Sequence, residues 1–432
     1  MPTPKPSTNP LTILITGASI AGPTTAYFLA RAFPTASIKI LERHPHLRPG
    51  GQAIDIRTSG VTVMRKIPGL EPLVRARGSP EEGVAFMRSD GGVWGTLRKS
   101  GESERQGLVS EFEILRGELS EILVGLSKEV GVGRVEYLFG ESVAFVRQSC
   151  DDEGSVEVAY TSGRSAERFN LVVACDGATS RTRALAFSCE VRDHVHPTNI
   201  WAAYFSTSRD LLEGGKIAQG LSAVGGRLIT LGPDTPTQNR VMLMAVLPSS
   251  HTDAITTFRE ASAQGPEALK QHVAHHFQHA EWKTNLLLEE MHCAEDFYAS
   301  EIVQVKCPSL YKGRVVLVGD AGYAAGQTGN GTTLALTGAY ILAGELSQHP
   351  GDLAAGLEAY EQRMRPLIDS MQKVPPFVST FAAPQTAWGI TVRNLAFAAL
   401  ARSGVVGFAQ RYLGAAFADS KEFPLPEYSW AQ

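Results

Sequence analysis

Short apolar runs alternate along this chain with longer alanine- and leucine-rich segments. The runs are rich in valine, isoleucine and leucine, and each ends at a glycine or an acidic residue, a pattern that predicts buried strands. They are residues 11–16, 37–41, 170–175 and 314–320. The helical segments at 23–33 and 332–346 follow the first and the last of these runs. This alternation of strand and helix is typical of an α/β fold.

The middle of the chain changes to stretches in which apolar and polar residues alternate, which predicts antiparallel sheet. The predicted elements are a hairpin at 84–98 turning at Asp90-Gly91, a meander of 134–139, 142–147 and 155–160, a sheet of 200–207, 226–232 and 240–247, and helices at 112–128, within 253–291 and at 352–373. We therefore expect a mixed α/β and α+β fold, in which a Rossmann-like domain is interleaved with an antiparallel-sheet substrate domain and followed by a C-terminal helical segment. The expected boundaries are 1–80, 111–183 and 301–350 for the first, 81–110 and 184–300 for the second, and 351–432 for the third.

Composition narrows the class of protein. A chain of 432 residues has room for two domains, and its net charge of -4 gives no reason to expect nucleic acid as a partner. The five cysteines are scattered without a C-x-x-C, which favours a reducing compartment and no metal site. The proline-rich start lacks the apolar core of a signal peptide, and arginines 393, 402 and 411 interrupt the last apolar runs. We expect a soluble cytoplasmic protein with no transmembrane segment.

The first strand leads into a nucleotide-binding pattern. Gly17, Ser19 and Gly22 occupy the G-x-G-x-x-G frame, with serine in place of the middle glycine. Glu42 ends the second predicted strand, 20 residues after Gly22. At that distance a dinucleotide-binding βαβ unit has a carboxylate for a ribose hydroxyl, and its first helix directs free N–H groups at a pyrophosphate. A glycine-rich loop in another kind of α/β protein remains the alternative.

A second glycine-rich loop, 321–331, follows Asp320 and leads into a helix, so we expect a polar ligand to be held at both helix N-termini. Arg116 lies near the start of another helix, where a surface ion pair with Glu113 is an equally good interpretation. The four histidines of one helix are interpreted as an exposed polar face rather than a metal site, since no acidic third ligand stands nearby. They are His272, His275, His276 and His279.

Together these features resemble the class A FAD-dependent monooxygenases, the para-hydroxybenzoate hydroxylase-like group. The helical arginine, the D-G-x-x-S-x-x-R at 176–183 and the late Gly-Asp occur in that family's order. The segments GGQAIDI and EFEILRGELSEIL are most similar to the branch with tetracycline-inactivating and polyketide-tailoring hydroxylases. The resemblance implies an enzyme with FAD and a transient NADPH or NADH reductant, which uses O₂ and a flavin C4a-hydroperoxide to hydroxylate or epoxidise an aromatic or polyketide-like small molecule.

The resemblance also implies roles for single residues. It assigns to the cofactor Gly17, Ser19, Gly22, Glu42, Arg43, Gly51, Asp55, Arg116, Asp176, Asp320, Gly329, Asn330 and Gly331. In this assignment Glu42 holds the adenosine ribose, Asp55 lies along the flavin ring and Asp320 binds a ribityl hydroxyl. Asp176 connects FAD with the nicotinamide pathway. One departure is that the family's G-D-A-A-H and following proline are here Gly-Asp-Ala-Gly-Tyr and a loop without proline.

The substrate-contacting residues are expected in the middle domain. Alternation along 200–207 places Trp201, Ala203 and Phe205 on one strand face, which is interpreted as a pocket wall, although an ordinary core is an equally good interpretation of the two aromatics. Lys216 and Gln327 are further candidates, and no catalytic side chain is assigned because the cofactor carries the chemistry.

Two other functions stay open. They are an FAD-dependent oxidative cyclase or dehydrogenase of secondary metabolism and a non-catalytic protein that binds FAD or a ligand; a flavin-dependent halogenase would share the fold, but its W-x-W-x-I-P signature is absent from this sequence. Either state, monomer or dimer, remains possible.

Overall fold

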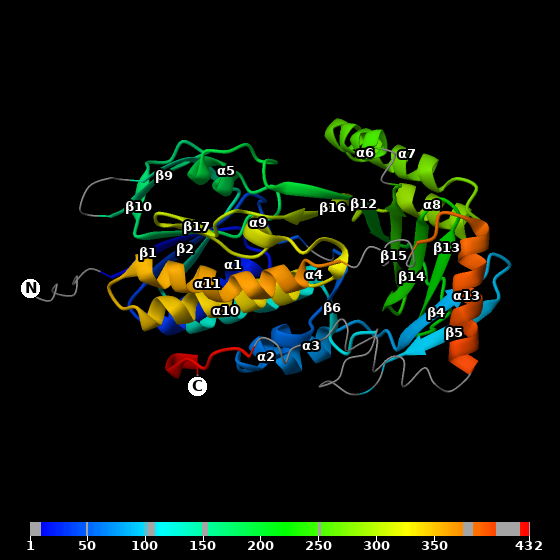
Figure 1. The fold of residues 1–432 in the computed structure, drawn as a ribbon, viewed down its shortest axis with the longest axis horizontal. Coiled ribbons are helices and arrows are strands. Elements are labelled where there is room, and N and C mark those ends of the chain that lie inside the picture. The colour runs from blue at the N-terminus through cyan, green and yellow to red at the C-terminus, as the bar shows by residue number, and fades with distance from the viewer. Residues whose placement is uncertain are drawn as a thin grey trace, which may run out of the picture.

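The computed structural model describes residues 10–48, 51–99, 101, 109–148, 154–248, 252–374, 383–402 and 424–431. Figure 1 shows two sheet-based parts that lie side by side along the long axis of the molecule. The chain passes between them several times, so each part is built from segments far apart in the sequence.

The first part is built on a six-stranded sheet in the order β17-β18-β11-β1-β2-β7. Its strands are β1 (Thr12–Thr16), β2 (Ser37–Glu42), β7 (Val135–Phe139), β11 (Leu171–Ala174), β17 (Tyr311–Lys312) and β18 (Val315–Leu317). All neighbours are parallel except β17, which runs antiparallel to β18. Parallel strands are covered on both faces, and the central β1 accordingly buries Ile13, Leu14 and Ile15 completely. The four strands predicted from apolar runs all lie in this sheet.

Helices cover this sheet. They are α1 (Ala21–Ala32), α4 (Arg116–Val130), α10 (Gly331–Gln348) and α11 (Leu353–Met371), with α2 (Thr58–Arg65) and α3 (Leu70–Arg77) beside them. α10 is the most buried, because it packs between α1 and α11 and is apolar on all sides. Figure 1 shows α10 and α11 lying side by side in front of the sheet. The helices predicted at 23–33, 332–346 and 352–373 are confirmed.

Two predictions around residues 112–160 are wrong in detail. The expected antiparallel meander breaks up, because β7 pairs in parallel with β2, and only β8 (Val143–Gln148) and β9 (Val156–Tyr160) form an antiparallel sheet, with β10 (Glu167–Phe169). The helix predicted from residue 112 begins at Arg116, since the preceding residues form β6 (Glu113–Leu115) against β3 (Ala53–Asp55). Local alternation cannot show which distant strand a segment pairs with.

The second part is a seven-stranded sheet in the order β16-β12-β15-β14-β13-β4-β5. Its strands are β4 (Gly83–Met87), β5 (Val93–Arg98), β12 (Val195–Ser206), β13 (Ile217–Ala223), β14 (Arg227–Thr235), β15 (Gln238–Val246) and β16 (Tyr298–Val305). Helices α6 (Thr252–Gln264), α7 (Pro266–Phe277) and α8 (Thr284–Cys293) bury one face of this sheet in a second apolar core. The predicted hairpin at 84–98 therefore joins the predicted sheet of 200–247.

The C-terminal helix α13 (Ala387–Arg402) packs on the opposite face of that sheet, along β5 and β13 (Figure 1). Its Phe397 contacts Phe86, and its Arg393 donates to the hydroxyl of Ser222. The strand neighbours of Phe86 and Ser222 point to the other face of the sheet, into the core under α6, α7 and α8. The short elements are α5 (Arg181–Phe187), α9 (Asp320–Tyr323), η1 (Gly326–Thr328) and η2 (Ser429–Ala431). Across the described ranges, no helix has both the length and the apolar character to cross a membrane.

Candidate functional site

The turn between β1 and α1 leaves no room for side chains. Gly17 has φ +96°, and a Cβ there would lie 2.5 Å from the carbonyl oxygen of Cys175. A Cβ on Gly22 would lie 1.9 Å from the carbonyl oxygen of Gly17. Both positions therefore require glycine, as the nucleotide-binding pattern predicts. The N-terminus of α1 carries no side-chain cap, so its first N–H groups stay available to an anion.

Glu42 ends β2 next to this turn. Its two carboxylate oxygens accept hydrogen bonds from the N–H groups of Ala18, at 2.9 Å, and His44, at 3.0 Å. The side chain is half-buried and is held at the carboxyl edge of the sheet, beside the turn. Acceptor capacity remains on both oxygens, so a ribose hydroxyl can donate to this carboxylate.

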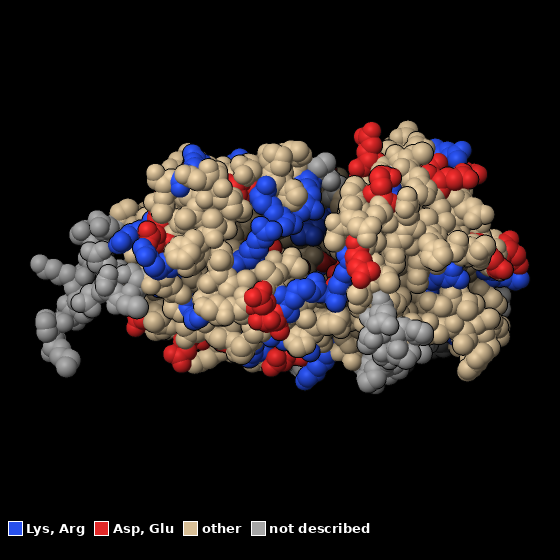
Figure 2. Space-filling view, turned by 90° about the horizontal axis from the view of Figure 1, so that it is seen from above, with Lys and Arg blue, Asp and Glu red and all other residues tan. Residues whose placement is uncertain are grey.

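Three arginines gather near the same turn. The Nε of Arg116 donates to the Oγ of Ser19 at 3.0 Å, although the two residues are 97 positions apart. Burial and the neighbouring charges of Arg43 and Arg116 lower the pKa of Arg48. Like charges brought together in this way favour an anionic ligand. Figure 2 shows lysine and arginine side chains bordering the hollow between the two parts of the molecule.

Asp320 lies where β18 ends, between two helix N-termini. A Cβ on Gly319 would lie 3.0 Å from Ala21 at the start of α1, and one on Gly331 would lie 3.7 Å from the Oδ1 of Asp320. The Asp320 side chain is open to solvent, yet its surroundings desolvate it enough to raise its pKa against the opposing effect of Arg116. Because Asp320 is both accessible to water and surrounded by protein, it lies in a recess of the surface.

The N-terminus of α10 faces this recess. Asn330 is its N-cap residue and makes no side-chain capping bond, and Gly329 before it has φ +74° with nothing within 4 Å of a Cβ. The first N–H groups of α10 and the positive end of its dipole can therefore stabilise negative charge on a ligand.

Gly51 precedes β3 and Asp55 ends it, and β3 pairs with the three residues before Arg116. A Cβ on Gly51, at φ +99°, would lie 3.4 Å from the Cβ of Arg116. Asp55 makes an ion pair of 3.0 Å with Arg57 and stands directly across from Glu113 in the β3–β6 pair. Burial first, and then the charge of Asp55, raise the pKa of Glu113 to about 7. Burial and Glu113 in turn raise the pKa of Glu81 to about 8.

Asp176 holds a turn rather than standing free. One carboxylate oxygen accepts from the hydroxyl of Ser180 at 2.5 Å, and the other accepts from the N–H and hydroxyl of Thr182. These bonds fix the start of α5. Arg183, which is fully buried, then donates to the carbonyl oxygen of Ala321 at 2.7 Å. The Asp-Gly turn is thereby connected with the segment that follows Asp320.

The predicted pocket wall is wrong. Trp201, Ala203 and Phe205 do share a strand face, but all three are fully buried in the core under α6, α7 and α8. The opposite face of the same sheet carries partly exposed residues, among them Tyr204, Met242 and Met244. The alternation along 200–207 correctly separates the two faces of the strand. Which face is core depends on where α6, α7 and α8 pack, and the alternation does not show that.

Tyr298 connects the uncovered face of the seven-stranded sheet with the loop beside Arg116, on the side of the β1–α1 turn. The rings of Tyr204 and Tyr298 stack with centroids 5.1 Å apart. The hydroxyl of Tyr298 accepts from the N–H of Gln52 at 2.8 Å and donates to the Oε1 of Gln52. Gln52 lies next to Gly51, and its carbonyl accepts from the N–H of Arg116. Sequence patterns indicated none of these three tyrosine and glutamine residues.

The other two substrate candidates lie apart from this face. Lys216 is exposed and makes an ion pair of 3.3 Å with Glu82. Gln327 lies in η1, where its Oε1 is buried without a hydrogen-bond partner among the described residues. Neither side chain is brought together with Tyr204 and Tyr298 by a contact in the described part of the chain.

The histidine prediction is also wrong for two residues. His272 and His276 turn inward against Trp201, with ring centroids 5.6 and 5.1 Å away. Burial lowers the pKa of both, that of His276 to about 4. His275 and His279 are exposed as predicted. Within the described ranges no group of three His, Cys, Asp or Glu side chains is placed to hold a metal ion.

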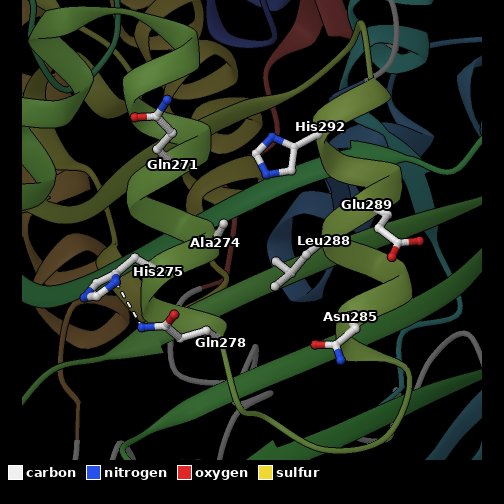
Figure 3. Close-up of a pocket in the computed structure, with 8 residues that line it drawn as sticks. All are labelled: Gln271, Ala274, His275, Gln278, Asn285, Leu288, Glu289 and His292. Atoms are coloured by element: carbon white, nitrogen blue, oxygen red, sulfur yellow. Dashed lines mark hydrogen bonds between the residues drawn. The ribbon is translucent and has the colours of Figure 1, made fainter.

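A groove of about 530 Å³ runs between α7 and α8, as Figure 3 shows. Its lining includes His275 of α7 and Gln278 just after that helix, which bond to each other at 3.0 Å, and Asn285, Leu288 and Glu289 of α8. These helices cover the sheet face opposite Tyr204. The groove is thus separate from the nucleotide side, and no predicted site residue lines it.

Comparisons with known proteins agree with this arrangement. The family model described as "FAD binding domain" matches residues 10–373. The chain is 32% identical to the FAD-dependent monooxygenase asL6 of Sarocladium schorii over 433 residues, covering 96% of this chain and 97% of the relative. The crystal structure of tetracycline destructase Tet(51) superposes with a TM-score of 0.76 at 26% identity, over 97% of this chain and 100% of that one. Klebsiella pneumoniae HpxO, complexed with FAD and uric acid, shares the fold at 18% identity, with a TM-score of 0.68 over 94% and 97% of the two chains.

Proposed function

The chain belongs to the FAD-binding-domain family and is an FAD-dependent monooxygenase, and from this premise we propose that it uses NADPH or NADH and O₂ to hydroxylate or epoxidise an aromatic, polyketide-like small molecule. The observation that carries the proposal is the position of Gln52. It bonds to Arg116 on the nucleotide side and to Tyr298 on the open sheet face, so a cofactor and a substrate held on these two sides meet at this residue.

The recess fits FAD in its donor set. We assign the pyrophosphate to the α1 N-terminus with Gly17, Ser19 and Gly22, because glycine is sterically required there and an arginine stands over the serine. Glu42 takes the adenosine ribose and Asp320 a ribityl hydroxyl. We assign the contacts with the flavin ring to the N–H groups of Gly329, Asn330 and Gly331. The other contacts with FAD are assigned to Arg43, Gly51, Asp55 and Arg116.

In this proposal the cofactor carries the chemistry, and the N-terminus of α10 and Asp176 support it. FAD, when bound, would supply the redox chemistry, which is hydride acceptance from the reductant and activation of O₂, with one oxygen atom going to the substrate and the other to water. The N-terminus of α10 stabilises negative charge at the ring edge that it faces. Asp176 acts indirectly, by holding the α5 turn and, through Arg183, the segment after Asp320.

The open sheet face supports a planar, unsaturated substrate. Tyr204 and Tyr298 offer a stacked aromatic surface, and Met242 and Met244 offer polarisable, adaptable side chains next to it. Tet(51), at 26% identity, is named for its action on tetracycline, a polycyclic polyketide, and this similarity supports the same substrate class here. Phe397 of α13 and Phe86 extend the apolar surface at the far end of the sheet.

The test is a screen of aromatic and polycyclic polyketide compounds against the FAD-loaded protein. We expect at least one compound to accelerate NADPH or NADH oxidation in air and to yield a product one oxygen atom heavier. The matched control is Tyr204→Ala, which removes the stacking surface without touching the nucleotide side; its FAD content should stay unchanged while stimulation weakens. Oxidised product that gains no oxygen would favour a dehydrogenase or cyclase instead.

A further inference from the structure

A second hollow, of about 660 Å³, lies against the loop that follows Asp320. It is formed where the start of β12 and the end of β16 meet the C-terminal turns of α11, and it includes Gly322 and Gln327 of the cofactor-side loop. We call it the outer hollow and define it by Thr198, Lys306, Gln327, Asp369 and Lys373. Its volume lies within the range of about 300–1,000 Å³ that is usual for small-molecule sites.

The outer hollow carries two unpaired cations. Lys306 and Lys373 are exposed, and among the described residues neither ammonium group has a hydrogen-bond or ion-pair partner. By contrast, Arg365 in the same lining is engaged by Glu361 and by the carbonyl oxygens of Cys307 and Pro308. Two free lysines from different elements that face one hollow favour a phosphate-bearing ligand.

An amide and a carboxylate complete the lining. The Oε1 of Gln327 is buried without a partner, so a ligand N–H that reached this amide would satisfy it. Asp369 is exposed and can accept from a ribose hydroxyl. A set of two cations, one carboxylate and one free amide matches the phosphates, ribose and carboxamide of a nicotinamide nucleotide.

The wall between the outer hollow and the cofactor-side loop is rigid. Gln304 donates to the carbonyl oxygens of Ala325 and Gln372, at 3.3 and 2.7 Å. Gln372 donates in return to those of Val305 and Ala324, at 2.8 and 2.9 Å. Both amides are buried, so these bonds fix the end of α11 to β16 and to the loop that leads to Gly329.

We propose that the outer hollow is the docking site of the nicotinamide nucleotide that reduces the cofactor, with its phosphates on Lys306 and Lys373 and its carboxamide end toward Gln327. This inference rests on the proposed function, which requires such a reductant. It explains how a chain with one dinucleotide-binding βαβ unit serves two dinucleotides: the second binds transiently in a hollow lined by Gly322 and Gln327, which lie in the chain between Asp320 and Gly329 of the first site.

The test measures nucleotide binding in the FAD-loaded full-length protein. Anaerobic rapid mixing with NADPH, and separately with NADH, yields a dissociation constant from the concentration dependence of flavin bleaching. We expect Lys306→Ala and Lys373→Ala each to raise this constant about 3- to 10-fold and the double variant more, with the limiting rate unchanged. The control Lys128→Ala, exposed on α4, should have no effect. An increase for NADPH alone would assign the lysines to the 2′-phosphate, and an increase for both would assign them to the pyrophosphate.

A second readout needs no variant and no turnover. Reductive methylation of the wild-type protein, read by mass spectrometry, should label Lys306 and Lys373 less in the presence of NADP⁺, while the labelling of Lys128 stays constant. Unchanged labelling and an unchanged dissociation constant in the double variant, in a protein that NADPH or NADH still reduces, would overturn the docking site alone. A wild-type protein reduced by neither nucleotide would overturn the proposed function as well.

Discussion

Gln52 and Tyr298, which are 246 positions apart, bond to each other twice: the Gln52 N–H donates to the Tyr298 hydroxyl, and that hydroxyl donates to the Gln52 side chain. The pair fastens the β16 end of the substrate sheet to the loop beside Arg116. Burial raises the pKa of the Tyr298 hydroxyl well above its usual range, so it stays protonated and able to donate at neutral pH.

Tyr298→Phe should therefore weaken substrate use more than folding. The variant keeps the stacked ring and loses both bonds, so we expect a loss of about 1–2 kcal/mol in the free energy of unfolding and a several-fold rise in KM. Tyr204→Phe is the matched control, since the Tyr204 hydroxyl has no hydrogen-bond partner among the described residues. Equal effects in the two variants would show that the Gln52 contact is unimportant.

Gly22→Ala should abolish FAD binding or folding, because its Cβ would overlap the carbonyl oxygen of Gly17. Gly125→Ala is the control: this glycine lies inside α4 with nothing within 4 Å of a Cβ, and alanine there should stabilise the protein by about 0.5–1 kcal/mol. Thermal unfolding and flavin absorbance after gel filtration measure both effects. A yellow, stable Gly22→Ala protein would refute the tight turn.

Asp320→Ala should lower FAD affinity by about tenfold or more, as expected for the loss of a hydrogen bond to a charged group. Fluorescence titration of the apoprotein with FAD measures the dissociation constant. Asp90→Ala, on the exposed turn of the β4–β5 hairpin, should leave it unchanged. If Asp320→Ala bound FAD like the wild type, the assignment of this carboxylate would be wrong.

Stability should fall as pH rises from about 4.5 to about 8. Glu81 and Glu113 have folded-state pKa values of about 8 and 7 against a reference of 4.5, so the folded chain holds protons that the unfolded chain releases. This stabilisation is complete below pH 4.5 and disappears as pH passes through 7 to 8. Glu113→Gln should flatten the decline, by an amount of about 1–2 kcal/mol at pH 9, and the exposed Glu121→Gln should not. Urea unfolding of the apoprotein across this pH range measures it.

Arg183→Gln should destabilise the fold by about 2–4 kcal/mol, because the variant leaves the carbonyl oxygens of Ala178, Val191 and Ala321 without their donor. Arg181→Gln, two residues away and exposed, should lie within about 0.5 kcal/mol of the wild type. Chemical unfolding compares the two. Equal stability would mean that water replaces the arginine without loss.

Sequence patterns predicted the β1–α1 turn and the end of β2 correctly and the substrate-facing side of the sheet wrongly, for physical reasons. Gly17 and Gly22 are fixed by sterics within one turn, and Glu42 by the length of one βαβ unit, so local spacing suffices to find them. Trp201 and Phe205 were assigned to a pocket because alternation divides a strand into two faces without showing which face α6, α7 and α8 cover. His272 and His276 lie on helix α7, where helical spacing likewise groups residues on one face without showing that this face packs on Trp201.

The contact that joins the two sides had no local signal at all. Gln52 lies in the GGQAIDI segment and Tyr298 in no motif, and nothing local pairs the two; their bond exists only because β16 returns to the loop before β3. Likewise, Val135–Phe139 has the alternation expected of an antiparallel strand, but it pairs in parallel with β2 at the edge of the six-stranded sheet. Long-range pairing of this kind depends on the whole chain. The predicted domain boundaries stay a prediction.

The central claim is that one atom of O₂ is transferred to a substrate held between Tyr298 and the cofactor. The direct measurement is a turnover of the FAD-loaded protein with ¹⁸O₂, reductant and a stimulating polyketide, followed by mass spectrometry of the product. We expect a product with one ¹⁸O atom, and no label when ¹⁸O is supplied as water instead. A product without ¹⁸O from O₂ would contradict it.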